Sequence, residues 1–145
     1  MAQTGDVIVG NGAVTFGLEY RDEMSDQGLC IHALGEVDGC DVELLRFDCF
    51  DHQPHYHYGP ENKNERLMLD RTTEGDGLDW ALTQISTKLP DMVRRAGYEE
   101  LADGVDLAAM ESTLQELETT ARRMARERRS TVMHDRGDTV LRRGP

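Results

Sequence analysis

The period of the hydrophobic residues changes once along this chain, and that change constrains the fold more than any other feature. Up to about residue 70, apolar side chains alternate with polar ones, as they do along 14–20. This period of two is typical of strands with one buried face. From about residue 77 the apolar residues recur every three or four positions, which is the period of an amphipathic helix. Strands followed by helices are typical of the α+β class.

The clearest turn in the first half is Asp38-Gly39, which separates two apolar runs, 29–37 and 40–50. Asp-Gly is a preferred two-residue type I′ turn between antiparallel strands. We therefore predict a hairpin here, within an antiparallel meander of about five or six strands. The strands are expected between about residues 6 and 70.

The hairpin also predicts which side chains are neighbours. If no bulge interrupts it, Cys30 faces Phe47, and Cys30 and Cys49 share the face of His32. A thiol–imidazole pair is then one interpretation of these residues. Burial of the cysteines beside the aromatic ring is the alternative.

Two helices are predicted between about residues 77 and 129, packed on one face of the sheet. Pro90 lies inside the first and should kink or split it, because proline removes a helical hydrogen bond. The second helix carries a narrow apolar seam from Leu107 to Met124. Such a seam packs either within the chain or against a second chain.

The length of 145 residues favours one domain, which we place at residues 1–129. Residues 130–145 lack a hydrophobic period, and we expect them to form a loose tail that contains arginine. The three cysteines, an odd number, are expected to be free thiols. No long apolar run and no basic leader are visible, which predicts a cytoplasmic protein outside the membrane.

Charge is distributed unevenly. The chain holds 16 basic and 28 acidic residues, a net charge of −12. Residues 122–145 hold eight arginines against three acidic residues, a charge of +5, so the remaining residues carry −17. The acidic part repels phosphate backbones and so disfavours nucleic acid as a partner. The Arg-rich end suits contact with an acidic protein surface, including that of a second copy.

The segment around His55 and His57 is chemically the most suggestive. Two histidines two residues apart on a strand point to one face and are a natural pair of metal ligands. Glu61, His52 or Asp51 could complete a site for a divalent metal such as Zn, Fe or Mn. The alternative is that the intervening tyrosines pack inward while the two histidines face solvent or hydrogen-bond with neighbours.

The pattern His55-x-His57-x-x-x-Glu61 resembles the core of the first cupin motif, whose histidines and glutamate bind a metal inside a β-barrel. The chain departs from that motif, because Cys49 and Met68 stand where glycines are expected. The helical second half is also foreign to a plain cupin.

Two longer blocks, 43–51 (ELLRFDCFD) and 55–62 (HYHYGPEN), resemble an uncharacterised bacterial family. The resemblance runs from about Leu29 to Ala125 and implies no activity.

Two functions remain as hypotheses, because no complete catalytic set is visible. The first is a small accessory or regulatory protein, for example a subunit of a larger enzyme complex. It would bind a protein partner or a second copy through the Leu107–Met124 helix and the Arg-rich end. The second is a metal-binding module or small metal-dependent enzyme that uses His55 and His57.

Overall fold

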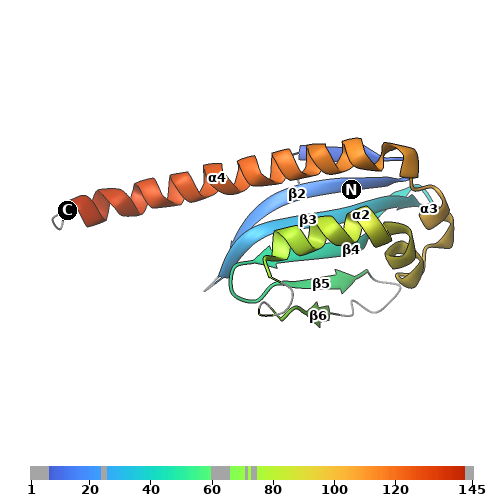
Figure 1. The fold of residues 1–145 in the computed structure, drawn as a ribbon, viewed down its shortest axis with the longest axis horizontal. Helices are drawn as coiled ribbons and strands as arrows, with labels where there is room; N and C mark the ends of the chain where they lie inside the picture. The colour runs from blue at the N-terminus through green and yellow to red at the C-terminus, as the bar shows by residue number, and fades with distance from the viewer. Residues whose placement is uncertain (1–6, 24–25, 60–65, 71, 73–74, 143–145) are drawn as a thin grey trace.

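The computed structural model shows a six-stranded antiparallel sheet whose strands follow one another in chain order (Figure 1). It describes residues 7–23, 26–59, 66–70, 72 and 75–142, with the backbone alone at residues 7, 23 and 128–142. The strands are β1 (Val7–Asn11), β2 (Val14–Glu23), β3 (Asp26–Val37), β4 (Cys40–Phe50), β5 (His55–Tyr58) and β6 (Arg66–Met68). The predicted meander is confirmed.

Helices follow the sheet, as the change of period predicts. They are α2 (Gly77–Arg95), α3 (Glu99–Asp103), the 3-10 helix η2 (Leu107–Ala109) and α4 (Met110–Arg142). Of the strands, α2 contacts β4 most, and α4 packs against β1, β2 and β3. Both long helices lie over the same face of the sheet (Figure 1). The predicted α+β class is therefore confirmed.

The hairpin between β3 and β4 turns at Asp38-Gly39. Their φ angles are 53° and 82°, and both are positive, as a type I′ turn requires. Val37 pairs with Cys40 directly across the turn, which is the predicted register.

A β-bulge interrupts the same ladder farther from the turn. Leu34 pairs with Glu43, but the adjacent Ala33 pairs with Leu45, so Leu44 is the extra residue of β4. One extra residue in a strand exchanges the two faces for everything beyond it. The predicted register is therefore wrong from the bulge onwards.

The bulge changes which residues are neighbours. Cys30 pairs with Asp48 and not with Phe47, which pairs with Ile31. Cys49 consequently lies on the opposite face of the sheet from Cys30.

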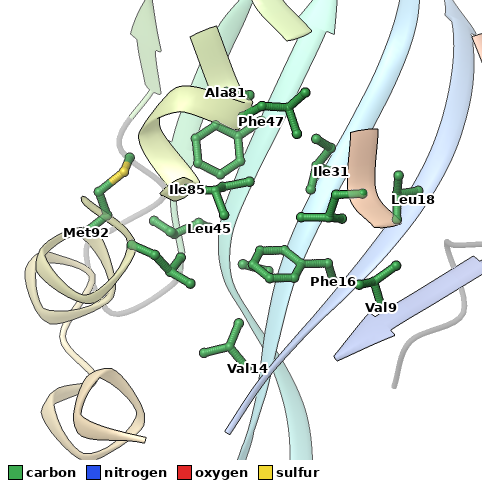
Figure 2. Close-up of a cluster of buried hydrophobic side chains, with 14 of the residues drawn as sticks. Val9, Val14, Phe16, Leu18, Ile31, Leu45, Phe47, Ala81, Ile85 and Met92 are labelled. Carbon is green, nitrogen blue, oxygen red and sulfur yellow. The ribbon is translucent and has the colours of Figure 1, made fainter. Parts of the chain in front are cut away.

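The core lies between the sheet and the two long helices (Figure 2). Val9, Phe16, Ala33 and Leu45 form one row across four strands. All four are at most 1% exposed, and Ile85 of α2 is fully buried. Burial of these apolar side chains is the main source of stability of the fold.

α2 begins at the N-cap residue Asp76, whose side chain accepts a hydrogen bond from the Asp79 backbone N–H at 3.0 Å. The split that Pro90 predicts does not occur, because α2 is one helix from end to end. Leu89 and Val93, on either side of the proline, are both fully buried. This shared contact with the core offsets the loss of one backbone hydrogen bond.

The predicted seam of the last helix is used within the chain. Met110, Leu117, Ala121 and Met124 are buried, whereas Leu107, in η2, is 68% exposed. α4 continues beyond residue 129 as far as Arg142 and projects past the edge of the sheet (Figure 1). Of the helices in the described part of the chain, none has both the length and the apolarity needed to cross a membrane.

Candidate metal centre

Ionisable side chains gather on the sheet face that points away from α2 and α4, which we term the polar face. Strand pairing places two rows there, His32–Arg46–His57 and Cys30–Asp48–His55. Four of these six side chains are buried, namely His32, Cys30, Asp48 and His55. Burying ionisable groups costs free energy unless they are paired, so contacts within the polar face must offset that cost.

Asp48 lies at the centre of this face and is 2% exposed. Its Oδ2 atom is 2.7 Å from His55 Nε2 and 3.0 Å from His57 Nε2. Arg46 Nε donates to the same Oδ2 at 3.2 Å, and the Cys30 thiol donates to Oδ1 at 3.0 Å. One ligand atom from each of Asp48, His55 and His57 lies within 4.8 Å of the others, a grouping that can hold a metal ion.

The orientation of His55 is set by its second ring nitrogen. Nδ1 lies 2.9 Å from the carbonyl oxygen of Gln53. A carbonyl only accepts, so Nδ1 donates to Gln53, and Nε2 donates to the Asp48 carboxylate; a metal ion bound at Nε2 would displace that proton. Histidines that bind metals are commonly held in this way, with one nitrogen on a backbone carbonyl and the other on the ion.

The loop that supplies the Gln53 carbonyl is held by Asp26. The Asp26 carboxylate accepts hydrogen bonds from the backbone N–H groups of Gln27, His52 and Gln53, at 3.0, 2.9 and 2.8 Å. Burial alone would raise the pKa of Asp26, but these bonds outweigh it and lower the pKa. Asp26 therefore fixes the loop immediately before His55.

His57 is held as a neutral ring. His57 Nε2 lies 2.9 Å from Arg46 Nη2 and 3.0 Å from Asp48 Oδ2, and because arginine only donates, the contact with Arg46 assigns Nε2 as an acceptor. Burial lowers the pKa of His57, and the Arg46 charge lowers it further, against the opposite effect of Asp48. Neutral imidazole is the form that binds metals.

Asp48 itself is held as a carboxylate. Burial by itself would raise its pKa, but the hydrogen bonds from His55 and Cys30 and the charge of Arg46 outweigh burial and hold the pKa well below its usual range. The centre therefore combines one ionised oxygen ligand with a neutral nitrogen ligand at His57.

His32 lies on the same face, but carboxylates occupy both of its ring nitrogens and it is not part of the three-residue group. Its Nε2 is 2.7 Å from Glu19, and its Nδ1 contacts Glu43. Both carboxylates accept, so both ring nitrogens donate and the ring is an imidazolium. Burial lowers the pKa of His32, but the two carboxylates more than compensate and raise it.

The thiol–imidazole pair, one of the two interpretations of these residues, does not form. The Cys30 thiol donates to Asp48 Oδ1, and the bulge at Leu44 turns Cys49 away from His32. Burial raises the pKa of Cys30, and the neighbouring Asp48 charge raises it further. Burial also raises the pKa of Cys49. Neither thiol is therefore activated as a nucleophile. All three cysteines are free, as predicted.

The structure brings together two of the five candidate metal ligands, His55 and His57. Asp51 lies in the loop before β5 and is not part of the three-residue group. His52 is exposed, lies in the loop before β5 and is not part of the three-residue group. Glu61 falls outside the described residues.

Asp48 was not among the ligands proposed from the sequence. The available signal was strand alternation, because Asp48 pairs with His55 across the turn that contains Pro54. That pairing depends on how many residues form the loop between β4 and β5, and the sequence does not specify this number. Arg46 was missed for the same reason, since it pairs with His57.

Two imidazole nitrogens and one carboxylate oxygen suit Zn, Fe or Mn rather than Ca or Mg. Three protein ligands also leave a coordination position for water or a small ligand. The residues present therefore fit a divalent transition metal.

Fold and site together define an α+β protein with a helix-covered sheet and an Asp–His–His cluster on the polar face. The chain belongs to the family described as Domain of unknown function (DUF7700), whose model matches residues 8–121. This match agrees with the resemblance to an uncharacterised family, and it includes the whole cluster. No curated protein and no solved structure matches the chain.

Proposed function

We propose that this protein binds a divalent transition metal through Asp48, His55 and His57. The observation that carries the proposal is the convergence of two Nε2 atoms on one carboxylate oxygen, at 2.7 and 3.0 Å. The backbone contact at His55 Nδ1 supports it, because that contact fixes the orientation of the ring with Nε2 directed at Asp48.

Zinc is the ion we favour. Two ligands at about 2.1 Å from a tetrahedral zinc ion are roughly 3.4 Å apart. The observed separations of 2.7 and 3.0 Å between Asp48 Oδ2 and the two ring nitrogens are shorter, so an ion requires a small outward movement of the rings. The ion would polarise a water or small ligand bound at its remaining position.

Metal titration of the full chain, prepared without a histidine tag, tests this proposal. Calorimetry with Zn²⁺, Fe²⁺ and Mn²⁺ is expected to show one ion per chain for the preferred metal, with a dissociation constant of about 1 µM or lower. A His55→Ala/His57→Ala double variant is expected to lose this binding.

His52→Ala is the matched control, because His52 is an exposed histidine only a few residues from the cluster. It is expected to bind metal as the unchanged chain does. Absence of stoichiometric binding by the unchanged chain, or equal binding by the double variant, contradicts the proposal.

We also propose a second role, self-association through the C-terminal half of α4. The observation that favours it is the projection of α4 beyond the sheet (Figure 1). The sequence adds charge complementarity, since residues 122–145 carry eight arginines against three acidic residues and the rest of the chain is strongly acidic. The acidic surface of a second copy is the partner that this arrangement fits.

Sedimentation at low and high salt tests the second role. A dimer at about 50 mM salt that dissociates at about 500 mM is expected, because screening weakens contacts between opposite charges. An Arg128→Glu/Arg129→Glu variant should be monomeric in both conditions. A monomer at low salt for the unchanged chain contradicts this role.

A further inference from the structure

Arg46 occupies the place between two of the proposed ligands. Its Nε donates to Asp48 Oδ2 at 3.2 Å, and its Nη2 donates to His57 Nε2 at 2.9 Å. Its side chain is 26% exposed, whereas that of Asp48 is 2% exposed. The guanidinium group therefore bridges two ligand atoms, one of which belongs to a buried carboxylate.

The contact between Arg46 and His57 Nε2 excludes a metal ion from the same nitrogen. A neutral imidazole has one nitrogen lone pair, and on His57 that lone pair is the acceptor for Arg46. A metal ion bound by Nε2 uses the same lone pair. Arg46 and a metal therefore cannot both occupy His57 Nε2.

The two acceptors also require a positive charge between them. Asp48 Oδ2 and His57 Nε2 are 3.0 Å apart, and both direct lone pairs towards Arg46. In the structure the guanidinium group supplies that charge. A divalent metal would supply it equally well, which makes the two cations alternative occupants of one position.

Arg46 has a second acceptor to which it can move. Glu43 Oε1 lies 3.7 Å from Arg46 Nη1, and the Glu43 side chain is 30% exposed. A modest rotation of the Arg46 side chain would therefore keep its charge paired while releasing His57.

Building on the proposed metal site, we infer that Arg46 is an internal competitor for the metal. It occupies His57 Nε2 in the metal-free protein, and the ion must displace it towards Glu43 in order to bind. Arg46 thereby sets the metal affinity of the site and keeps its ligands ordered between binding events.

The test is metal titration of Arg46→Gln beside Arg66→Gln. Arg66 pairs with His57 from the other neighbouring strand and is exposed. The Arg66→Gln substitution also removes one positive charge near the site, but it leaves Arg46 bound to the lone pair of His57 Nε2. Arg46→Gln is expected to bind Zn²⁺ at least about tenfold more tightly than the unchanged chain, and Arg66→Gln within about twofold of it.

Arg46→Lys keeps the charge and serves as a second variant in case the glutamine variant is poorly folded. One ammonium group on a flexible chain does not reproduce the fixed fork of a guanidinium. The lysine variant is therefore expected to bind the metal more tightly than the unchanged chain, though less tightly than the glutamine variant.

A spectroscopic measurement follows Arg46 directly. The ¹⁵N resonance of Arg46 Nε, assigned by its loss in Arg46→Lys, is expected to shift when Zn²⁺ is added, whereas that of Arg66 should not.

The outcomes separate the inference from the proposed function. Binding by the unchanged chain with no tightening in Arg46→Gln overturns the inference alone. Equal tightening in Arg46→Gln and Arg66→Gln also overturns it, because the effect is then one of general charge. Failure of the unchanged chain and all three variants to bind any of the three metals overturns both.

Discussion

Asp48 and His55 face one another across β4 and β5, with the Oδ2 atom of the carboxylate 2.7 Å from the Nε2 atom of the ring. Both side chains are buried, and the contact lies on the sheet face opposite the helices. The same oxygen is 3.0 Å from His57 Nε2, so one carboxylate organises the whole cluster. The predictions below test what this arrangement contributes to stability and to metal binding.

Replacing Asp48 with asparagine should destabilise the fold and abolish metal binding. The amide has the same shape, but it carries no charge and leaves Arg46 without its buried counter-ion. Breaking a buried charged pair in this way costs about 2–4 kcal/mol in the free energy of unfolding. Urea unfolding in metal-free buffer measures the loss. Asp22→Asn, an exposed change on β2, is the control and should leave the midpoint unchanged; an equal effect of both would contradict the prediction.

His32 should make stability depend on pH above neutrality. Its pKa is raised by Glu43 and Glu19 against burial, so the folded state holds the proton more tightly than the unfolded state. The resulting stabilisation is fully present below the unfolded pKa of about 6.5 and is lost as pH rises through the folded pKa.

A His32→Gln variant isolates this contribution. The difference in unfolding free energy between the unchanged chain and the variant should be larger at pH 6 than at pH 8. Asp48 does not affect this comparison. Its pKa is lowered in the folded state, so its contribution to the unfolding free energy is lost only when the pH falls below the range tested. If the difference in unfolding free energy is the same at pH 6 and pH 8, the prediction that a charged His32 stabilises the fold is wrong.

Asp26→Ala should loosen the metal centre without touching a ligand. The substitution removes the acceptor of three backbone N–H bonds and frees the loop that carries the Gln53 carbonyl. We expect a loss of about 1–3 kcal/mol in stability and weaker Zn²⁺ binding, because His55 is no longer held in position. Asp22→Ala serves as the matched control. Metal affinity is measured by calorimetry. An unchanged affinity in Asp26→Ala would contradict the prediction that this loop positions His55 for metal binding.

Gly12 should tolerate no side chain, whereas Gly10 should accept one. Gly12 has a φ of +60°, and a Cβ atom there would lie 2.2 Å from the Gly104 carbonyl oxygen. That oxygen accepts the Ala13 backbone N–H and ties the β1–β2 turn to the segment before η2. Gly12→Ala is expected to cost more than about 2 kcal/mol.

Gly10→Ala is the matched substitution, because no atom lies within 4 Å of a Cβ built at that position. It should change the unfolding free energy by less than about 1 kcal/mol. Similar thermal unfolding midpoints for the two variants would contradict the close packing at Gly12.

The sequence by itself determined the features that depend on near neighbours along the chain. A type I′ turn needs only Asp38-Gly39, and a buried helix face needs only apolar residues three and four apart. The same local rule placed His55 and His57 on one face, because side chains two residues apart on a strand are parallel. These features follow from backbone geometry over a few residues and require no knowledge of the rest of the fold.

Only the tertiary structure decided which residues complete the cluster. The bulge at Leu44 and the loop before β5 bring Asp48 and Arg46 beside the histidines. Both depend on how β3, β4 and β5 align, and that alignment is set by packing the other sheet face against α2 and α4. A shift of one residue exchanges the faces of a strand. Local sequence therefore cannot specify the partners of a site that is built across strands.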